Sequence, residues 1–322
     1  MSNTTLPPVQ WPATFAELKV EARVPESLAQ DLAQELKMPA YIAQHLLEVY
    51  QPLAQYCAAQ SAAQTQPYIL GVNGAQGTGK STAAKVVGTL LTDVSKLRVC
   101  TLSIDDLYLG REARRDLANR FHPLLATRGV PGTHDLALAL GVFDALKSAQ
   151  ATTVTHIPRF NKALDDCEPR ENWERFTGKP DVIIFEGWCV GATAQPDSAL
   201  DQPVNTLEES EDANGLWRRY VNDCLGDYQA LFAQLDLLVM LKAPSFDQVL
   251  EWRQLQESKL RDSLTPEQLA NSKVMSNSEV ARFIAHYERL TRWMFAEMPA
   301  RSNVLLSLDK NHQIATIQCH TP

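Results

Sequence analysis

Residues 68–87 read YILGVNGAQGTGKSTAAKVV, and this stretch decides the fold class. Gly74–Ser81 fits the pattern G-x-x-x-x-G-K-[ST], directly after a short apolar run and directly before a run of helix-forming residues. In that context, backbone N–H groups and the positive end of the helix face phosphate oxygens. The expected nucleotide-binding residues are Gly74, Ala75, Gln76, Gly77, Thr78, Gly79, Lys80, Ser81 and Thr82.

Two further residues extend this phosphate site. In such a loop, Lys80 reaches the β- and γ-phosphates and the Ser81 hydroxyl ligates magnesium. The apolar run 181–185 ends in Glu186, as in a Walker-B strand, where the carboxylate lies beside the metal. ATP and Mg²⁺ are therefore the expected cofactors, with Ser81 and Glu186 as metal ligands and Lys80 and Glu186 as catalytic residues.

Another apolar run, 98–104, leads into Asp105 and Asp106. Carboxylates at the carboxyl end of a parallel strand face the ligand crevice, where one of them can accept a proton from an attacking hydroxyl. Alternatively, the pair caps a following helix. Arg253, in a helix that follows the fourth apolar run, is the candidate for a lid over the γ-phosphate at 251–262. The alternative there is a surface helix with i,i+4 charge pairs.

Five apolar runs alternate with helical segments along the chain. They predict an α/β fold with a parallel sheet of about five strands and helices on both faces. Residues 1–65 are expected to form a loose tail, 1–12, and a helical preface that packs on a kinase-type domain, 66–322. Within that domain, 106–170 is too long for a simple crossover and predicts an acceptor-binding region. The acidic stretch at about 195–215 predicts an exposed insertion.

Composition excludes several classes of protein. The 322 residues carry a formal net charge of -8, which disfavours nucleic-acid binding. No apolar run approaches the roughly 20 residues that cross a bilayer, and the N-terminus does not resemble a secretory signal. Six cysteines lie far apart without a CxxC pair, which argues against zinc and disulfides and favours a reducing cytoplasm. The expected partner is a small molecule.

Several segments occur in the order seen in the D-glycerate 3-kinase family, which this chain resembles from about Tyr68 to Ile314. They include GAQGTGKS, SIDDLY (103–108), RGVPGTHD (128–135), IPRFNKALDD (157–166) and FEGW (185–188). The family belongs to a larger group with uridine kinase, phosphoribulokinase and pantothenate kinase. The resemblance implies that Asp105 activates the acceptor hydroxyl, with Asp106 as the fallback, and that the acceptor is glycerate-like.

A glycerate carboxylate needs positive partners, and bidentate arginine with a nearby lysine suits it. The alternative is that these side chains are solvated or structural. One departure lies in this region: plant-type members carry a Gly-rich segment where this chain has Asp165-Asp-Cys-Glu-Pro-Arg170. The substrate-binding candidates are Asp105, Asp106, Tyr108, Arg128, His134, Arg159 and Lys162.

The sequence thus predicts an ATP- and Mg-dependent kinase for a hydroxyl of D-glycerate or a similar hydroxy acid. Two alternatives stay open. One is a P-loop kinase for another alcohol, such as a nucleoside or a pantothenate-like acceptor. The other is a non-kinase ATP-binding regulatory protein that uses the acidic insertion for docking.

Overall fold

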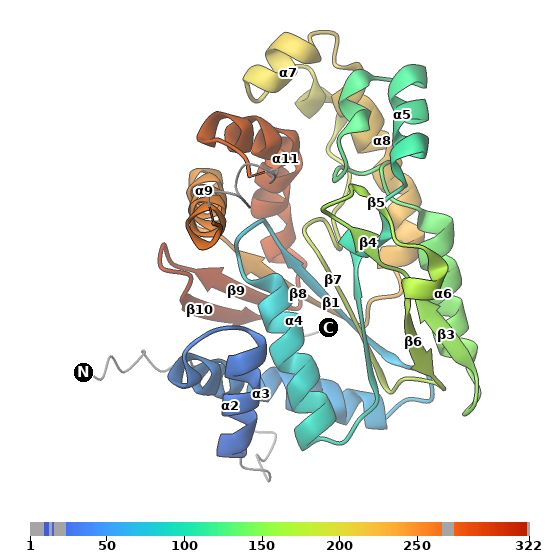
Figure 1. The fold of residues 1–322 in the computed structure, drawn as a ribbon, viewed down its shortest axis with the longest axis vertical. Helices are drawn as coiled ribbons and strands as arrows, with labels where there is room; N and C mark the ends of the chain where they lie inside the picture. The colour runs from blue at the N-terminus through green and yellow to red at the C-terminus, as the bar shows by residue number, and fades with distance from the viewer. Residues whose placement is uncertain (1–9, 13–14, 16–23, 266–273, 321–322) are drawn as a thin grey trace.

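A six-stranded sheet with the order β10–β9–β8–β1–β7–β2 forms the centre of the computed structural model (Figure 1), which describes residues 10–12, 15, 24–265 and 274–320. β2, β7, β1, β8 and β9 pair in parallel, which confirms the predicted sheet. β10 is antiparallel and was not predicted. The strands are β1 (Tyr68–Gly74), β2 (Val99–Ser103), β7 (Val182–Gly187), β8 (Leu237–Lys242), β9 (Val304–Leu308) and β10 (Ile314–Cys319).

An apolar cluster covers each face of the sheet. Alternate residues of one strand therefore belong to different clusters, because they point to opposite sides. In β7, Val182 and Ile184 join one apolar cluster, whereas Ile183 and Phe185 join the other. A strand that is buried on both faces has a nearly continuous run of apolar residues in its sequence. The strands of this sheet were predicted from such runs.

The helices divide between these two clusters (Figure 1). The first cluster contains buried residues of α2 (Glu26–Glu35), α3 (Ala40–Ala62), α4 (Lys80–Thr89) and α9 (Phe246–Ser263). The second contains residues of α6 (Leu136–Ser148), α8 (Leu216–Phe232) and α11 (Asn277–Glu297). The helical preface therefore shares its apolar core with the sheet. Most of the expected tail, 1–12, lies outside the described residues. No described helix has the length and apolar character needed to span a bilayer.

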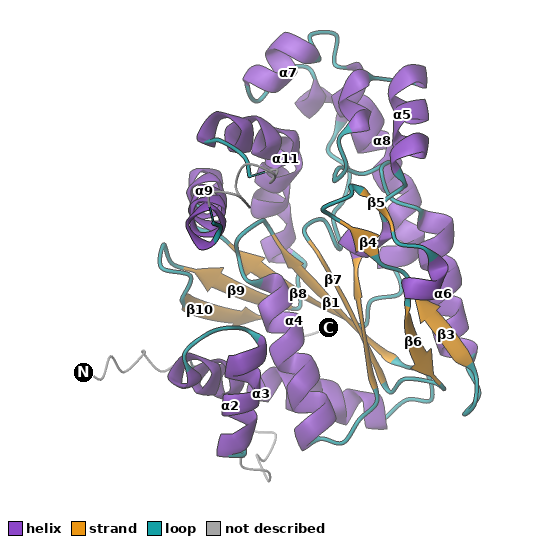
Figure 2. Cartoon of the chain, viewed as in Figure 1, coloured by secondary structure: helices purple, strands orange, loops and turns teal. Residues whose placement is uncertain are grey.

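The long region after β2 is built from short elements (Figure 2). It contains α5 (Arg111–Arg120) and two antiparallel ribbons, β3 (Val154–Ile157) with β6 (Glu174–Thr177) and β4 (Phe160–Asn161) with β5 (Asp166–Cys167). Sequence patterns did not predict the ribbons, because strands of two to four residues carry too few alternations to be recognised.

Most of the acidic stretch at 195–215 is exposed, as expected for an insertion, but two of its acidic residues are not. Glu208 and Asp212 are 0% and 2% exposed. Glu208 follows the start of α7 (Thr206–Glu211) and pairs with Arg289 of α11 at 2.6 Å. Asp212 pairs with Arg218 of α8 at 3.0 Å. A buried carboxylate needs such a partner, and here the acidic residues hold helices together.

Candidate active site

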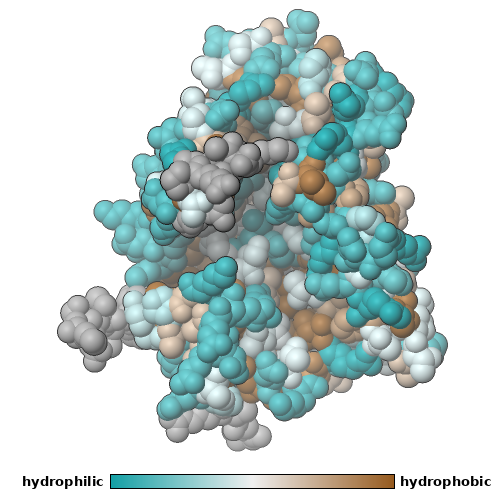
Figure 3. Space-filling view, viewed as in Figure 1, coloured by the Kyte–Doolittle hydropathy of each residue, from teal (hydrophilic) through white to brown (hydrophobic). Residues whose placement is uncertain are grey.

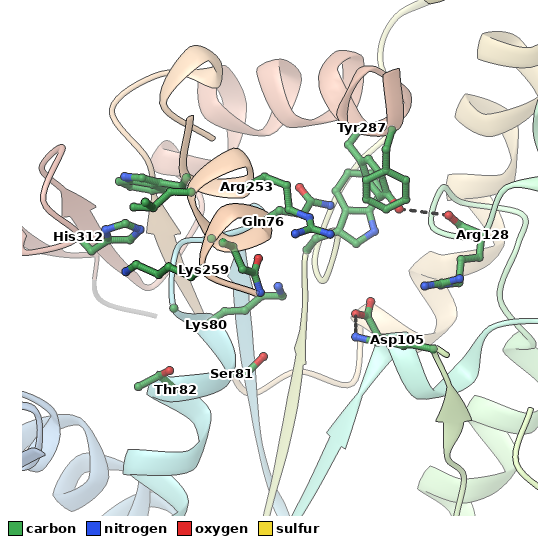
Figure 4. Close-up of a pocket in the computed structure, with 18 of the residues that line it drawn as sticks. Gln76, Lys80, Ser81, Thr82, Asp105, Arg128, Arg253, Lys259, Tyr287 and His312 are labelled. Carbon is green, nitrogen blue, oxygen red and sulfur yellow. Dashed lines mark hydrogen bonds and ion pairs between the residues drawn. The ribbon is translucent and has the colours of Figure 1, made fainter. Parts of the chain in front are cut away.

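A cavity of about 540 Å³ lies at the carboxyl ends of the parallel strands. The face seen in Figure 3 is hollowed near its centre, between α4 and the helices drawn above it. Figure 4 shows that Lys80, Asp105, Arg128 and Arg253 approach the cavity from different elements. Open α/β sheets bind their ligands at this edge.

The glycine loop forms one wall of the cavity. Gly77 and Gly79 have positive φ angles of 81° and 83°, a backbone conformation that L side chains rarely adopt. A Cβ on Gly77 would also lie 2.8 Å from Cβ of Trp252, so the loop and α9 can approach this closely only at glycine. Lining residues among those predicted are Gln76, Gly77, Gly79, Lys80, Ser81 and Thr82.

The other three predicted loop residues, Gly74, Ala75 and Thr78, do not line the cavity. Thr78 is buried, and its Oγ1 donates a hydrogen bond of 2.8 Å to the carbonyl of Ala75. This hydrogen bond stabilises the turn of the loop from within.

Ser81 and Glu186 meet, as the sequence predicted for a metal pair. Oγ of Ser81 donates to Oε1 of Glu186 at 3.0 Å. Glu186 is 6% exposed, and its Oε2 has no hydrogen-bond partner. An unpaired buried carboxylate oxygen is costly, so this atom is suited to a cation or to a water molecule that a cation holds.

Asp105 lines the cavity opposite Lys80, and both of its carboxylate oxygens accept hydrogen bonds. Oδ1 accepts from the hydroxyl of Tyr108 at 2.6 Å, and Oδ2 from Nζ of Lys162 at 2.7 Å. Burial acts to raise the pKa of Asp105, but the charges of Lys162 and Lys80 and these two hydrogen bonds outweigh it. The pKa of Asp105 is therefore held well below its ordinary value, and the carboxylate is ionised.

Two predicted cations, Arg128 and Lys162, line the cavity with Asp105. Arg128 pairs with Asp165, which also accepts an ion pair of 3.0 Å from the buried Arg114. Asp165 belongs to the segment that departs from the plant-type pattern. In this chain, Asp165 of that segment thus holds Arg128 at the cavity.

Three other candidates lie behind the cavity wall and do not line it. Asp106 accepts hydrogen bonds from Nη1 of Arg159 at 2.9 Å and from the backbone of Phe160 at 3.1 Å. His134 is buried, stacks on Tyr108 with ring centroids 4.7 Å apart, and bonds to the hydroxyl of Tyr228 at 2.6 Å. These contacts make Asp106, Arg159 and His134 supports for the lining residues, not contacts for a molecule in the cavity.

Arg253 lines the cavity from α9. Its Nη1 pairs with Oε2 of Glu257 at 2.6 Å, one helical turn away. Glu257 is 4% exposed, and its Oε1 accepts a hydrogen bond of 2.8 Å from the backbone of Met275, just before α11. The ion pair thus lies within α9 at the i,i+4 spacing of the alternative reading, but it is largely buried, and Glu257 is also bonded to the segment before α11.

Comparison with known proteins places this site in a family. No protein-family model matches the chain. The uncharacterized kinase mug58 of Schizosaccharomyces pombe is 32% identical over 243 residues, which cover 73% of this chain and 83% of that protein. The chloroplastic D-glycerate 3-kinase of Arabidopsis thaliana is 27% identical over 292 residues, 84% of this chain and 59% of the relative's length. The chain belongs to the D-glycerate 3-kinase family.

A solved structure shows the same fold. The D-glycerate 3-kinase from Cryptococcus neoformans superposes with a TM-score of 0.68 at 21% identity, covering 85% of this chain and 99% of that one. The activity follows from the relatives in sequence, which are named as kinases: the protein is a phosphotransferase that acts on an alcohol group.

Sequence reasoning did not assign several lining residues of this kinase a site role. Trp188, Phe283 and Tyr287 line the cavity and form an aromatic wall, in which the hydroxyl of Tyr287 donates to the carbonyl of Arg128. His312, from the β9–β10 turn, stacks on Trp252 with centroids 4.0 Å apart. No local pattern marks His312, because the turn reaches the glycine loop only through the folded sheet. Leu255, Gln256 and Lys259 of α9, which lie within the segment predicted as a lid, also line the cavity.

Proposed function

We propose that this kinase transfers the γ-phosphoryl group of ATP to a hydroxyl of a small hydroxy acid such as D-glycerate. One observation carries the proposal: the phosphate loop, an ionised carboxylate (Asp105) and two cations (Arg128 and Lys162) line a single cavity. Phosphoryl transfer needs little else, because positioning and charge stabilisation supply most of the rate enhancement.

The triphosphate is held by the loop amides, the N-terminus of α4 and Lys80. Ser81 and Glu186 would hold magnesium, a role that the unpaired Oε2 of Glu186 favours. Among the described residues, no group of three His, Cys, Asp or Glu could hold a metal ion. Phosphate oxygens and water would therefore complete the coordination, and the bound ion would neutralise charge on the phosphates.

Asp105 receives the proton of the acceptor hydroxyl. As the hydroxyl oxygen bonds to the γ-phosphorus, the bond from that phosphorus to the β–γ bridging oxygen breaks, and ADP leaves with the electron pair. Arg253, which Glu257 holds at the cavity, stabilises negative charge on the transferring group.

The acceptor end selects the substrate. Arg128 and Lys162 provide two positive partners for a carboxylate close to Asp105. The aromatic wall of Trp188, Phe283 and Tyr287, which lies beside Arg128, would exclude water from this part of the cavity. This composition suits a small anion with a hydroxyl group.

A coupled ADP-release assay across glycerate, glycerol, pantothenate and uridine tests the proposal. We expect D-glycerate to give the highest kcat/KM, with ADP release dependent on both magnesium and the acceptor. A higher kcat/KM for uridine or glycerol would overturn the acceptor assignment. ADP release that ignores every acceptor but responds to an added protein would favour the regulatory alternative.

A further inference from the structure

The two hydrogen-bond donors of Asp105 differ in how firmly they are held. Tyr108 is buried, and its ring is fixed by His134 on one side and the edge of Phe160 on the other. Lys162 comes from the turn between β4 and β5, and its side chain is 59% exposed. One donor is therefore part of the core, and the other reaches Asp105 from the solvent side.

The ion pair with Lys162 opposes the function of Asp105 as a proton acceptor. An ammonium 2.7 Å from Oδ2 stabilises the carboxylate and occupies an oxygen that an attacking hydroxyl would otherwise approach. The proximity of Lys162 is a main cause of the depressed pKa of Asp105. While this pair persists, water beside the γ-phosphate also lacks an effective base.

The pair is easily exchanged for another. The side chain of Lys162 is 59% exposed, whereas that of Asp105 is 24% exposed. A carboxylate that enters the cavity would give the ammonium a charge-assisted contact of the same kind as the one it leaves, so the exchange costs little. Arg128 lines the same cavity, and its guanidinium has donors beyond the one on Asp165. A carboxylate between Arg128 and Lys162 would draw the lysine away from Asp105.

We propose that Lys162 is a specificity-determining latch: it pairs with Asp105 until the carboxylate of an acceptor takes its ammonium group. Asp105 then accepts a proton effectively only when an anionic acceptor is in place. The inference rests on the proposed function, in which Asp105 is the proton acceptor and the substrate carries a carboxylate.

The latch acts on two reactions with the same bond changes. In transfer, the acceptor oxygen bonds to the γ-phosphorus, its proton goes to Asp105, and ADP leaves with the electron pair of the broken bond. In hydrolysis, water takes the place of the acceptor and inorganic phosphate is released. Lys162 forms no covalent bond in either reaction, and it suppresses hydrolysis by holding Asp105.

The test replaces Lys162 with Met and measures ATP hydrolysis without any acceptor. We expect hydrolysis to rise roughly tenfold, the effect of a change of about 1.4 kcal/mol in the barrier. Lys162→Arg, which keeps the charge, should retain the low rate of the wild type. Asp105→Asn combined with Lys162→Met should abolish the rise, because the gain passes through Asp105.

The second measurement compares glycerate with glycerol, which has a neutral hydroxymethyl group in place of the carboxylate. Lys162→Met should lower the ratio of kcat/KM for glycerate over glycerol by roughly 10²-fold, the loss of one charge-assisted contact. Lys85→Met is the matched control, because Lys85 forms an exposed pair of equal length, 2.7 Å, with Glu35 on the outer side of α4. This control should leave both measurements unchanged.

Two results would overturn the latch: hydrolysis by Lys162→Met at the wild-type rate, or an unchanged ratio of glycerate to glycerol. A wild-type enzyme that phosphorylates neither compound contradicts the proposed acceptor instead. The hydrolysis measurement then still reports on the pair of Lys162 and Asp105, because it uses ATP alone.

Discussion

The two halves of the cavity are built in different ways. The phosphate half is built mainly from one short segment, Gln76–Thr82, which follows a buried strand and starts a helix. The acceptor half consists of side-chain pairs that join distant segments, such as Asp105 with Lys162 and Arg128 with Asp165. A contiguous motif fixes the first half, whereas only the folded chain assembles the second. Substitutions in the phosphate half should therefore lower turnover with every acceptor. Substitutions in the acceptor half should lower turnover with some acceptors more than with others.

The largest effect is expected in the phosphate half. Lys80→Met should lower kcat by roughly 10³-fold, since it removes the cation that neutralises charge on the transferring group. The loss should be the same for every acceptor, as measured by coupled ADP release. The midpoint of thermal unfolding should match that of the wild type. Normal turnover by Lys80→Met would contradict the assignment of this loop as the phosphate site.

Asp105→Asn tests the acceptor half. It should lower kcat by roughly 10²-fold through loss of the proton acceptor, while ATP affinity measured by calorimetry stays close to that of the wild type. Asp106→Asn is the matched control, because the neighbouring carboxylate faces Arg159 behind the cavity wall. If Asp106→Asn impairs kcat as much as Asp105→Asn, the separation of the two aspartates is wrong.

Arg253 and Glu257 lie at the border between the halves. Glu257→Gln removes the charge that holds Arg253, and we expect kcat to fall roughly tenfold through misplacement of the guanidinium. A double-mutant cycle distinguishes positioning from a general structural role. The double variant, Arg253→Met with Glu257→Gln, should have the same kcat as Arg253→Met alone. Additive losses would show that Glu257 does not act through Arg253.

The smallest effect concerns stability. Burial lowers the pKa of His134 from 6.5 to about 4. Between these values the unfolded chain binds a proton that the folded chain does not, so folding stability is lost as the pH falls from 6.5 toward 4. The slope should be about 1.4 kcal/mol per pH unit. Urea unfolding of the wild type and of His134→Gln at several pH values measures this slope. If the free energy of unfolding depends on pH in the same way in both proteins, His134 is not its cause.

The same contrast explains what the sequence could predict. The buried strands, the helix after the glycine loop and the contact between Ser81 and Glu186 follow from local patterns and from the parallel sheet. The capping box of Ser276 and Glu279 at the start of α11 is a local signal of the same kind. Each of these signals lies within a few consecutive residues or at one edge of a sheet.

The remainder depends on partners that lie far apart in the chain. Glu208 looked exposed because its neighbours are acidic, yet its partner, Arg289, lies 81 residues away. The local pattern did not distinguish Asp105 from Asp106, although the family resemblance favoured Asp105. The fold separates them, because Asp105 pairs with Lys162 at the cavity and Asp106 pairs with Arg159 behind it. His312 reaches the glycine loop because β10 returns along β9, a pairing that no local pattern announced.

The end of β7 carries one further consequence. Glu186 contacts Ser81 in the phosphate loop, and two residues later the indole of Trp188 donates to the carbonyl of Gly129, next to Arg128. Under the proposed function, this short segment therefore contacts the ATP side and the acceptor side of the cavity at once. Because free-energy coupling between two ligands is reciprocal, any change that one substrate imposes on this segment would alter the affinity for the other by the same factor.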